Sequence, residues 1–575
     1  MRRMHRTIGL PMLVTALIAA SACGGDDTSS PDTSGAETTA ASVVDTTAPT
    51  DSSVEPTDTS VDTVPPAPTE EPVRLSAPAS GPIDSFTWAT SFEAVSLDPL
   101  YSWNYPENTI LPNMCESVVG MTPDLELVPG LASAIDTSDP LKVVLTVREG
   151  VTFWNGNPMT ADDVAFSLAR NLDPALGSYF GSFWTRVASV DTTGDSEVTI
   201  TLTEPDSMFW KTLAMAAGAV SEKASVEAAG SAYGTPAGGL MCTGPFQFTS
   251  WEAGGDLVMT ANATYWNPEL TPLAGEAIIR SVPDDAALTN ALRTGEIDGS
   301  FQTPVSAIAA LDGAGTFYGG ESTMTHMLIP SLDGPLGDVR LRKALSLAID
   351  RTVIGDVAWE GTAEPVYSVA SPATWGYEKD TFAAAYADLG IAPTADLEAA
   401  KALVAEVGPV EPMTIWAPNE NASMVTTANY IAGVAAEIGL EINVETVPIQ
   451  QYSNWVYDPA SREATDLFQT IWYTDVPEPL QALWPLVQPG GLFNFYGYDN
   501  AEVLDEFAAA FAASDDAERA GHVTAGQQLM FGDDMLWIPV VNIATPTFIG
   551  SRISGPPVGL PAYLYSPWAA YVGAA

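Results

Sequence analysis

Residues 148–170 constrain the fold more than any other stretch, because several local signals follow one another there. Residues 143–147 alternate apolar and polar side chains, Glu149-Gly150 supplies a turn, and residues 151–154 return to an apolar pattern. This order predicts a β-hairpin. Asn155-Gly156 is a second turn signal, because both residues tolerate positive φ.

A helix start follows the second turn. Thr160 suits the N-cap position, and Asp162 and Asp163 place two carboxylates in the first turn, where the helix dipole favours negative charge. Val164 and Leu168 then supply apolar side chains to the predicted helix.

The length of the chain and its charge narrow the class of protein. At 575 residues the chain is too long for one core and predicts two or three domains. The 21 basic and 72 acidic residues give a net charge of −51, which excludes a nucleic-acid-binding protein because little could neutralise phosphate. The acidity favours solubility in an extracellular medium, with attraction of cationic ligands as a second interpretation.

The N-terminus carries export signals. Arg2, Arg3 and Arg6 precede an apolar run at residues 8–20, which is typical of a signal peptide and too short for a spanning helix. The small residues before Cys23 resemble a bacterial lipobox, although Ala20 stands where Leu is usual. We therefore expect a lipid on Cys23, and ordinary cleavage near Ala22 is the alternative.

Changes in composition predict the domain boundaries. Residues 1–23 are the lipoprotein signal peptide, and residues 24–82 are a Thr, Ser, Asp and Pro-rich disordered tether with a reach of about 40–45 Å.

Several motifs, taken in order, resemble one protein family. Residues 148–164 fit R-x-G-V-x-F-x-x-G-x-P-x-x-A-x-D-V, which is similar to the signature of the peptide- and nickel-type extracytoplasmic solute-binding proteins of ABC importers, family 5. The other matching blocks are residues 96–99, 114–119, 127–132, 242–246 with Trp251 and 262–266, 294–299, 337–351 and 466–479.

The resemblance implies an α/β fold with two lobes, like other periplasmic binding proteins, and an extra subdomain in the first lobe. On this resemblance we expect a first lobe at residues 83–322 with an inserted α+β subdomain at about 130–240, a second lobe at 323–545, and a return to the first lobe at 546–575. The chain crossings near 319–325 and 542–547 would then form a hinge. It implies a monomeric receptor without cofactor or catalytic activity, which captures a small solute, in the first place a peptide, by hinge closure. Its partners would be the ligand, the permease subunits of the importer and the membrane, through the N-terminal lipid. It would be extracytoplasmic, either lipid-anchored to the outer face of the cell membrane or periplasmic.

The resemblance also points to ligand-binding residues. In the family's peptide binders, an Asp at the position of Asp475 contacts the ligand's amino group; the alternative is that Asp475 only caps the following turn. Aromatic residues near loop ends could line a cleft or belong to the core. The candidates for ligand contact beside Asp475 are Trp472, Tyr473, Trp416, Asn419, Trp103 and Tyr105.

The cysteines divide into Cys23 and the pair Cys115 and Cys242. Outside the cytoplasm we expect this pair to be oxidised to a disulfide. Two free buried thiols are the alternative, and a metal site is disfavoured because no His lies nearby in sequence.

Motifs of catalysis are absent from the sequence. It contains no G-x-S-x-G, H-E-x-x-H, P-loop or paired C-x-x-C, and only His326 and His522 follow the signal peptide. Four Asp-Asp doublets, at 162, 284, 515 and 533, are better explained as helix starts and turns, since neighbouring residues do not share a face. The alternatives left open are a receptor for an oligosaccharide or a metal chelate, a secreted lipid-anchored hydrolase, and a structural surface protein.

Overall fold

The structure is a computed structural model that describes residues 75–575, apart from residues 103, 321, 420 and 463–464. The predicted signal peptide, Cys23 and the tether up to residue 74 therefore lie outside the described residues. Within the described part, the α/β fold has two lobes, each built around a large mixed sheet. The two-lobed α/β architecture predicted from the sequence is confirmed.

The sheet of the first lobe has seven strands among the described residues, in the order β12-β19-β11-β1-β10-β9-β8. The strands are β1 (Ile83–Thr90), β8 (Phe246–Trp251), β9 (Leu257–Ala261), β10 (Ala274–Ser281), β11 (Gly299–Ser300), β12 (Gly315–Gly320) and β19 (Thr545–Gly550). β1 runs parallel to β10 and β11, and its Phe86 and Trp88 are fully buried. Helix α5 (Asp285–Thr294) connects β10 to β11.

A large insertion separates β1 from β8. In its described residues it contains a four-stranded sheet in the order β4-β5-β7-β6 and a short β2-β3 pair. The strands are β2 (Val119–Met121), β3 (Leu127–Pro129), β4 (Ala132–Asp136), β5 (Lys142–Val147), β6 (Val187–Gly194) and β7 (Glu197–Leu202). The helices are α1 (Tyr105–Ile110), α2 (Ala161–Ala169), α3 (Phe209–Thr212) and α4 (Lys223–Ala229).

The predicted hairpin in residues 143–154 is wrong. β5 pairs with β4 on one side and β7 on the other, so the returning chain has no free edge to join. Instead Val151 and Phe153 are buried in the core, and a bridge between Thr152 and Pro158 closes the turn at Gly156, whose φ is +87°.

The predicted start of α2 is confirmed. Thr160 is the N-cap, its hydroxyl accepts from the Asp163 amide, and the Asp163 carboxylate accepts from the Thr160 amide. Asp162 and Asp163 lie in the first turn, as expected. Two of the other doublets also begin helices, since Asp284 and Asp515 are the N-caps of α5 and α14 (Asp516–Gln527), whereas Asp533 and Asp534 lie at the end of a π-helical segment.

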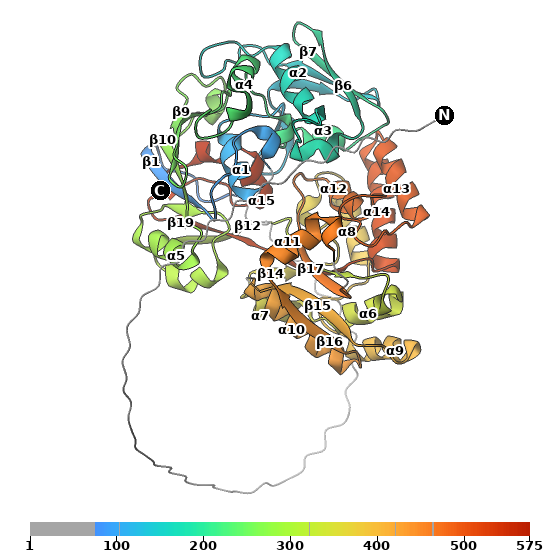
Figure 1. The fold of residues 1–575 in the computed structure, drawn as a ribbon. Coiled ribbons are helices and arrows are strands. Elements are labelled where there is room, and N and C mark those ends of the chain that lie inside the picture. Colours follow the sequence, from blue (N-terminus) through green and yellow to red (C-terminus); the bar gives the residue numbers. More distant parts are fainter. Residues whose placement is uncertain (1–74, 103, 321, 420, 463–464) are drawn as a thin grey trace, which may run out of the picture. The chain divides into compact units, whose positions relative to one another are not determined.

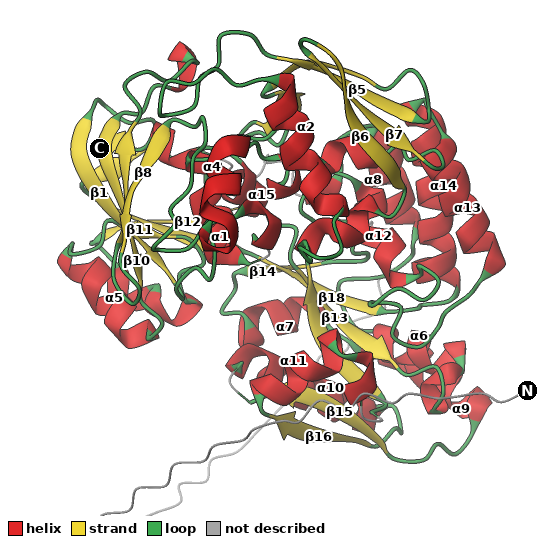
Figure 2. Cartoon of the chain, turned by 45° about the horizontal axis from the view of Figure 1, so that its top comes forward, coloured by secondary structure: helices red, strands yellow, loops and turns green. Residues whose placement is uncertain are grey.

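The sheet of the second lobe has six strands in the described residues, in the order β14-β18-β13-β17-β15-β16. They are β13 (Thr325–Pro330), β14 (Ala363–Pro365), β15 (Met413–Pro418), β16 (Ile442–Val447), β17 (Leu467–Trp472) and β18 (Ile538–Ile543). The helices are α6 (Val339–Ala348), α7 (Arg351–Ala358), α8 (Lys379–Asp388), α9 (Leu397–Val407), α10 (Ala422–Glu437), α11 (Ile449–Tyr457), α12 (Pro479–Leu483), α13 (Ala501–Ala512) and α14 (Asp516–Gln527). Figure 2 shows α10 against the sheet at β15 and β16, which it contacts.

The chain passes between the two large sheets at two places in the described residues. It leaves the first at β12 and enters the second at β13, then returns between β18 and β19. β19 pairs with β12 and β11, and Figure 1 shows β19 beside β12. The last residues form α15 (Leu560–Tyr565) and the pair β20 (Ile553–Ser554) and β21 (Gly573–Ala574), and α15 packs against α1.

The end of the predicted tether is ordered. Leu75 bridges Pro557 and Gly81 bridges Ala574, while the Ser80 amide donates to the Ala574 carbonyl at 2.7 Å. The expectation of disorder is therefore wrong for residues 75–82, because these backbone groups find partners in the C-terminal segment.

Cys115 and Cys242 form a disulfide, as predicted. It ties the segment after α1 to the segment before β8, which are 127 positions apart. Within the described part of the chain, no helix is long and apolar enough to cross a membrane.

Candidate ligand-binding site

The loop that follows β17 places Asp475 at a contact between the lobes. The strand ends at Trp472, and Glu478 caps α12 by accepting from the Leu480 amide. The Thr323 hydroxyl, from the first chain crossing, donates to the Thr474 carbonyl at 2.9 Å and fixes the loop beside that crossing.

The Asp475 carboxylate is partly buried and is held by neutral groups. Its Oδ1 accepts from the Tyr565 hydroxyl, and its Oδ2 accepts from Gln481 Nε2 at 3.1 Å. The Asp475 amide donates to Gln481 Oε1 at 3.0 Å. Burial raises the pKa of Asp475 to about 6, although these hydrogen bonds oppose the rise. The carboxylate is therefore unusually easy to protonate.

Four tyrosines interact with Asp475, and a fifth, Tyr457, interacts with three of them. We call the five the tyrosine cluster: Tyr105, Tyr179, Tyr457, Tyr473 and Tyr565. The rings of Tyr105 and Tyr473, on different lobes, lie 5.9 Å apart at 41°. Burial raises the pKa of the Tyr105, Tyr473 and Tyr565 hydroxyls, and the Asp475 charge raises it further. Their phenols therefore stay neutral hydrogen-bonding groups.

The cluster draws on both lobes. Tyr105 begins α1, Tyr179 begins a 3-10 turn in the insertion, and Tyr565 ends α15, all in the first lobe. Tyr457 ends α11 and Tyr473 follows β17, both in the second lobe. Tyr179 and Tyr457 keep 45% and 60% of their surface exposed, so the cluster is open to solvent at these two residues.

Three residues after Asp475, a buried ion pair also joins the lobes. Lys211 on α3 pairs with Glu478, and Arg519 on α14 lies 3.7 Å from the same carboxylate. The ring of Tyr377 lies between the two cations and donates its hydroxyl to Glu478 at 3.1 Å. Burial opposes ionisation of Glu478, but the two cations outweigh it and hold its pKa below the usual value.

The structure brings together Asp475, Tyr473 and Tyr105 from the predicted contacts, and it places the others differently. Trp416 is 3% exposed and donates its Nε1 to Glu445 Oε2 at 3.2 Å. Trp472 packs against Phe493 and Trp537 in the core of the second lobe. Asn419 is exposed at the end of β15, and Trp103 lies outside the described residues. A direct ligand contact by these four stays a prediction.

Sequence reasoning did not single out Tyr179, Tyr457, Tyr565 or Gln481. Tyr565 is 90 positions from Asp475, and nothing in its surroundings in the sequence marks it as part of a site. Gln481 had a weak local signal, because it lies in the short helix that the Pro-bounded loop begins.

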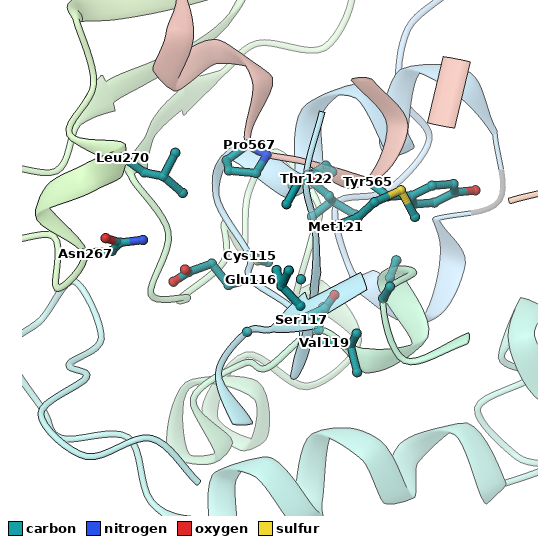
Figure 3. Close-up of a pocket in the computed structure, with 18 of the residues that line it drawn as sticks. Cys115, Glu116, Ser117, Val119, Met121, Thr122, Asn267, Leu270, Tyr565 and Pro567 are labelled. Carbon is teal, nitrogen blue, oxygen red and sulfur yellow. The ribbon is translucent and has the colours of Figure 1, made fainter. Parts of the chain in front are cut away.

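A cavity of about 170 Å³ lies in the first lobe, next to the disulfide (Figure 3). Glu116 lines it and accepts from the Tyr265 hydroxyl, Trp266 Nε1 and the Thr243 hydroxyl. Tyr565 lines the cavity as well, so this residue borders both the cavity and Asp475. Because Glu116 already has three donors, the arrangement is typical of a structural buried carboxylate.

No group of three or more metal-binding side chains occurs in the described residues. The histidines do not gather near Asp475 either. His326 is fully buried against Gln469 in the second-lobe sheet, and His522 on α14 pairs with Glu506.

Comparison with known proteins agrees with this architecture. Residues 126–494 match the model of "Bacterial extracellular solute-binding proteins, family 5 Middle". The glutathione-binding protein GsiB of Escherichia coli O1:K1 / APEC is 26% identical over 458 residues, which cover 78% of this chain and 86% of that protein.

Two solved structures have a similar fold. The ABC transporter substrate-binding protein CtaP of Listeria monocytogenes has a TM-score of 0.75 at 21% identity, covering 86% of this chain and 99% of that chain. The periplasmic binding protein DppA of Helicobacter pylori, in complex with the peptide STSA, has a TM-score of 0.69 at 20% identity, covering 86% and 98%. The chain therefore belongs to family 5 of the bacterial extracellular solute-binding proteins, the non-enzymatic receptors that bind a small solute outside the cytoplasm and serve an ABC importer.

Proposed function

We propose that this protein captures a solute with a cationic amino group, a peptide being the first candidate, and delivers it to the permease of its importer. The observation that carries the proposal is the carboxylate of Asp475. It is partly buried between the lobes, and the groups that set its pKa include no cation. A carboxylate in such a place is costly to ionise without a counter-charge, so an ammonium group of the ligand would complete the site.

In this proposal the ligand also drives hinge closure. Tyr105 and Tyr565 belong to the first lobe, and Tyr473 and Asp475 belong to the second. A ligand that contacts both sets binds best when the lobes are together, and it therefore shifts the population toward the closed state. The crossings near 319–325 and 542–547 are the proposed hinge.

We further propose that a lipid on Cys23 anchors the receptor to the outer face of the membrane, with the residues after it as a tether. This position would keep the receptor near its permease. Replacement of Cys23 by Ser should release the protein from the membrane fraction, and retention of Cys23→Ser in that fraction would contradict the anchor.

The ligand can be identified by native mass spectrometry of the protein as purified, followed by calorimetric titration of the released compound. A compound with an ammonium group is expected. The Asp475→Asn variant should lose about 2–5 kcal/mol of binding free energy, the range for truncating one partner of a buried charge pair.

Asp534→Asn is the matched control. Asp534 also accepts from a tyrosine hydroxyl, that of Tyr498 at 2.6 Å, and from Asn500 Nδ2 at 3.0 Å, both within the second lobe. This variant should bind as the wild type does. Unchanged affinity in Asp475→Asn, or a neutral sugar as the bound compound, would remove the amine anchor from the proposal.

A further inference from the structure

The charges around Asp475 also determine whether the site can bind a carboxylate of the ligand in addition to its ammonium group. Short peptides and amino acids carry a carboxylate as well as an ammonium group, and proteins hold ligand carboxylates most strongly with Arg or Lys. The tyrosine cluster offers hydroxyls and aromatic rings, and Asp475 adds a carboxylate. The question is whether any cation of the chain is placed to bind a ligand carboxylate.

The arginines and lysines of the described residues are bound elsewhere. Arg170, Arg280, Arg340 and Arg552 pair with Asp98, Asp256, Asp338 and Asp298. Lys142, Arg186 and Lys401 pair with Asp139, Glu204 and Glu398. Arg342, Arg351 and Arg462 donate to backbone carbonyls. Arg148 and Lys223 lie over Trp266 and Phe166, and Arg293 donates to Asn290.

Lys211 and Arg519 are both held by Glu478, which lies three residues after Asp475. Lys211 and Arg519 are 6% and 4% exposed, so neither can turn toward a ligand without breaking a buried pair. The remaining two, Lys343 and Lys379, lie on α6 and α8 of the second lobe, and neither is among the groups that shift the pKa of Asp475.

The tyrosine cluster itself suits an ammonium group. Aromatic faces attract cations through the ring quadrupole, and a nearby carboxylate adds a direct charge partner. The same chemistry occurs inside this protein, where Lys211 Nζ lies 4.3 Å from the ring centre of Tyr377 beside Glu478.

We infer that the site selects organic ammonium compounds whose carboxylate is absent, amidated or outside the site, and that it discriminates against short zwitterions such as amino acids and dipeptides. This inference rests on the proposed function, because it assumes that Asp475 anchors the ligand amine. A short zwitterion would bring its carboxylate close to Asp475, and no cation of the described residues is placed to receive it. The cost of an unpaired, partly desolvated charge then lowers its affinity.

Matched ligand pairs test the inference on the full-length mature protein freed of bound ligand. The probes are L-phenylalanine, L-phenylalaninamide and phenethylamine, and phenylalanyl-leucine with and without a C-terminal amide, each measured by calorimetry. The amide or amine of each set should bind at least tenfold more tightly than its zwitterion. A zwitterion that binds as tightly as its amide, or more tightly, overturns the inference.

A gain-of-charge variant gives a second readout. Tyr457 is 60% exposed, so Tyr457→Arg should fold and should place a cation beside the cluster. It should raise the affinity for each zwitterion, relative to that for its amide or amine, by at least tenfold. Ile449→Arg, at an exposed position on the same helix, is the control and should leave the ratio unchanged.

Failure of the inference and failure of the proposed function are distinguishable. If the amine anchor is right and the inference wrong, Asp475→Asn weakens every amine while zwitterions match their amides. If the proposed function itself is wrong, Asp475→Asn leaves all affinities unchanged, and N-acetylated probes bind as well as the free amines. That second pattern overturns both.

Discussion

Lys211 and Glu478 form a buried ion pair although 267 positions separate them in the sequence. Lys211 comes from the insertion of the first lobe, and Glu478 caps α12 in the second lobe. The carboxylate is fully buried, so the pair depends on the fit between the two lobes at this point.

Removal of one partner of this pair should be strongly destabilising. Lys211→Met leaves the buried Glu478 with Arg519 alone, and a loss of about 3–5 kcal/mol in the free energy of unfolding is expected. Denaturant unfolding followed by tryptophan fluorescence measures it. Lys401→Met breaks an exposed pair with Glu398 and should cost less than about 1 kcal/mol. Equal losses in the two variants would contradict the importance of burial.

Binding of an amine should weaken in acid. The pKa of Asp475 is raised to about 6, and an ammonium ligand needs the ionised carboxylate. Below pH 6 each unit of pH should therefore lower the affinity about tenfold, because a proton must first leave Asp475. Calorimetry at pH 7.5, 6 and 5 tests this, and Asp475→Asn should have a flat profile over the range. A flat profile in the wild type would show that Asp475 does not titrate on binding.

The Tyr565 hydroxyl should affect the pH at which Asp475 takes up its proton. It donates to Asp475 Oδ1 and stabilises the ionised form, so it holds the pKa of Asp475 lower than burial alone would. Tyr565→Phe should shift the midpoint of the pH profile of binding upward. Tyr498→Phe, which removes the equivalent hydrogen bond to Asp534, should leave the midpoint in place.

The disulfide should stabilise the first lobe. Cys115 and Cys242 are 127 positions apart, and a loop of this length corresponds to about 4–5 kcal/mol in the chain-entropy account. The Cys115→Ser/Cys242→Ser double variant should lose a similar free energy of unfolding, and reduction of the wild type should have the same effect. A loss below about 1 kcal/mol would contradict this account.

His326 should contribute to acid unfolding. Burial lowers its pKa to about 4, below the usual value of 6.5. The unfolded chain therefore takes up a proton as the pH falls below 6.5 and the folded chain does not until about pH 4, so stability is lost in this window at up to about 1.4 kcal/mol per pH unit. His326→Gln should reduce the slope of stability against pH. Asp475 acts in the opposite direction, because its raised pKa makes the folded state gain stability as the pH falls below 6. The difference in slope between the wild type and His326→Gln therefore reports the contribution of the histidine alone.

Local signals predicted local structure well. The start of α2 at Thr160 and the end of α5 at Gly295, in the left-handed region, follow from side chains within one helical turn. The hairpin after β5 was wrong, because β4 and β7 compete for the edges of that strand from outside the run. A local pattern cannot report a competitor that lies far along the chain.

In the candidate site, too, some residues could be predicted from the sequence and others could not. The motif at residues 466–479 pointed to Asp475, whose role as ligand anchor stays a proposal, and Tyr473 and Tyr105 were found as aromatic residues near loop ends. Trp416 fitted the same description, yet it is buried and bonded to Glu445. Whether an aromatic residue faces a ligand or a core depends on which elements pack beside it.

By itself, the sequence determined the class of the protein, the starts of α2, α5 and α14, and the disulfide partners, and it pointed to Asp475 as a candidate ligand anchor. Each of these depends on residue types at short spacing or on an ordered set of motifs. Only the tertiary structure decided that the tyrosine cluster brings residues from both lobes to Asp475, and that the nearby cations are bound to Glu478. The physical reason is that these contacts join segments separated by tens to hundreds of residues, which meet only when both lobes have packed.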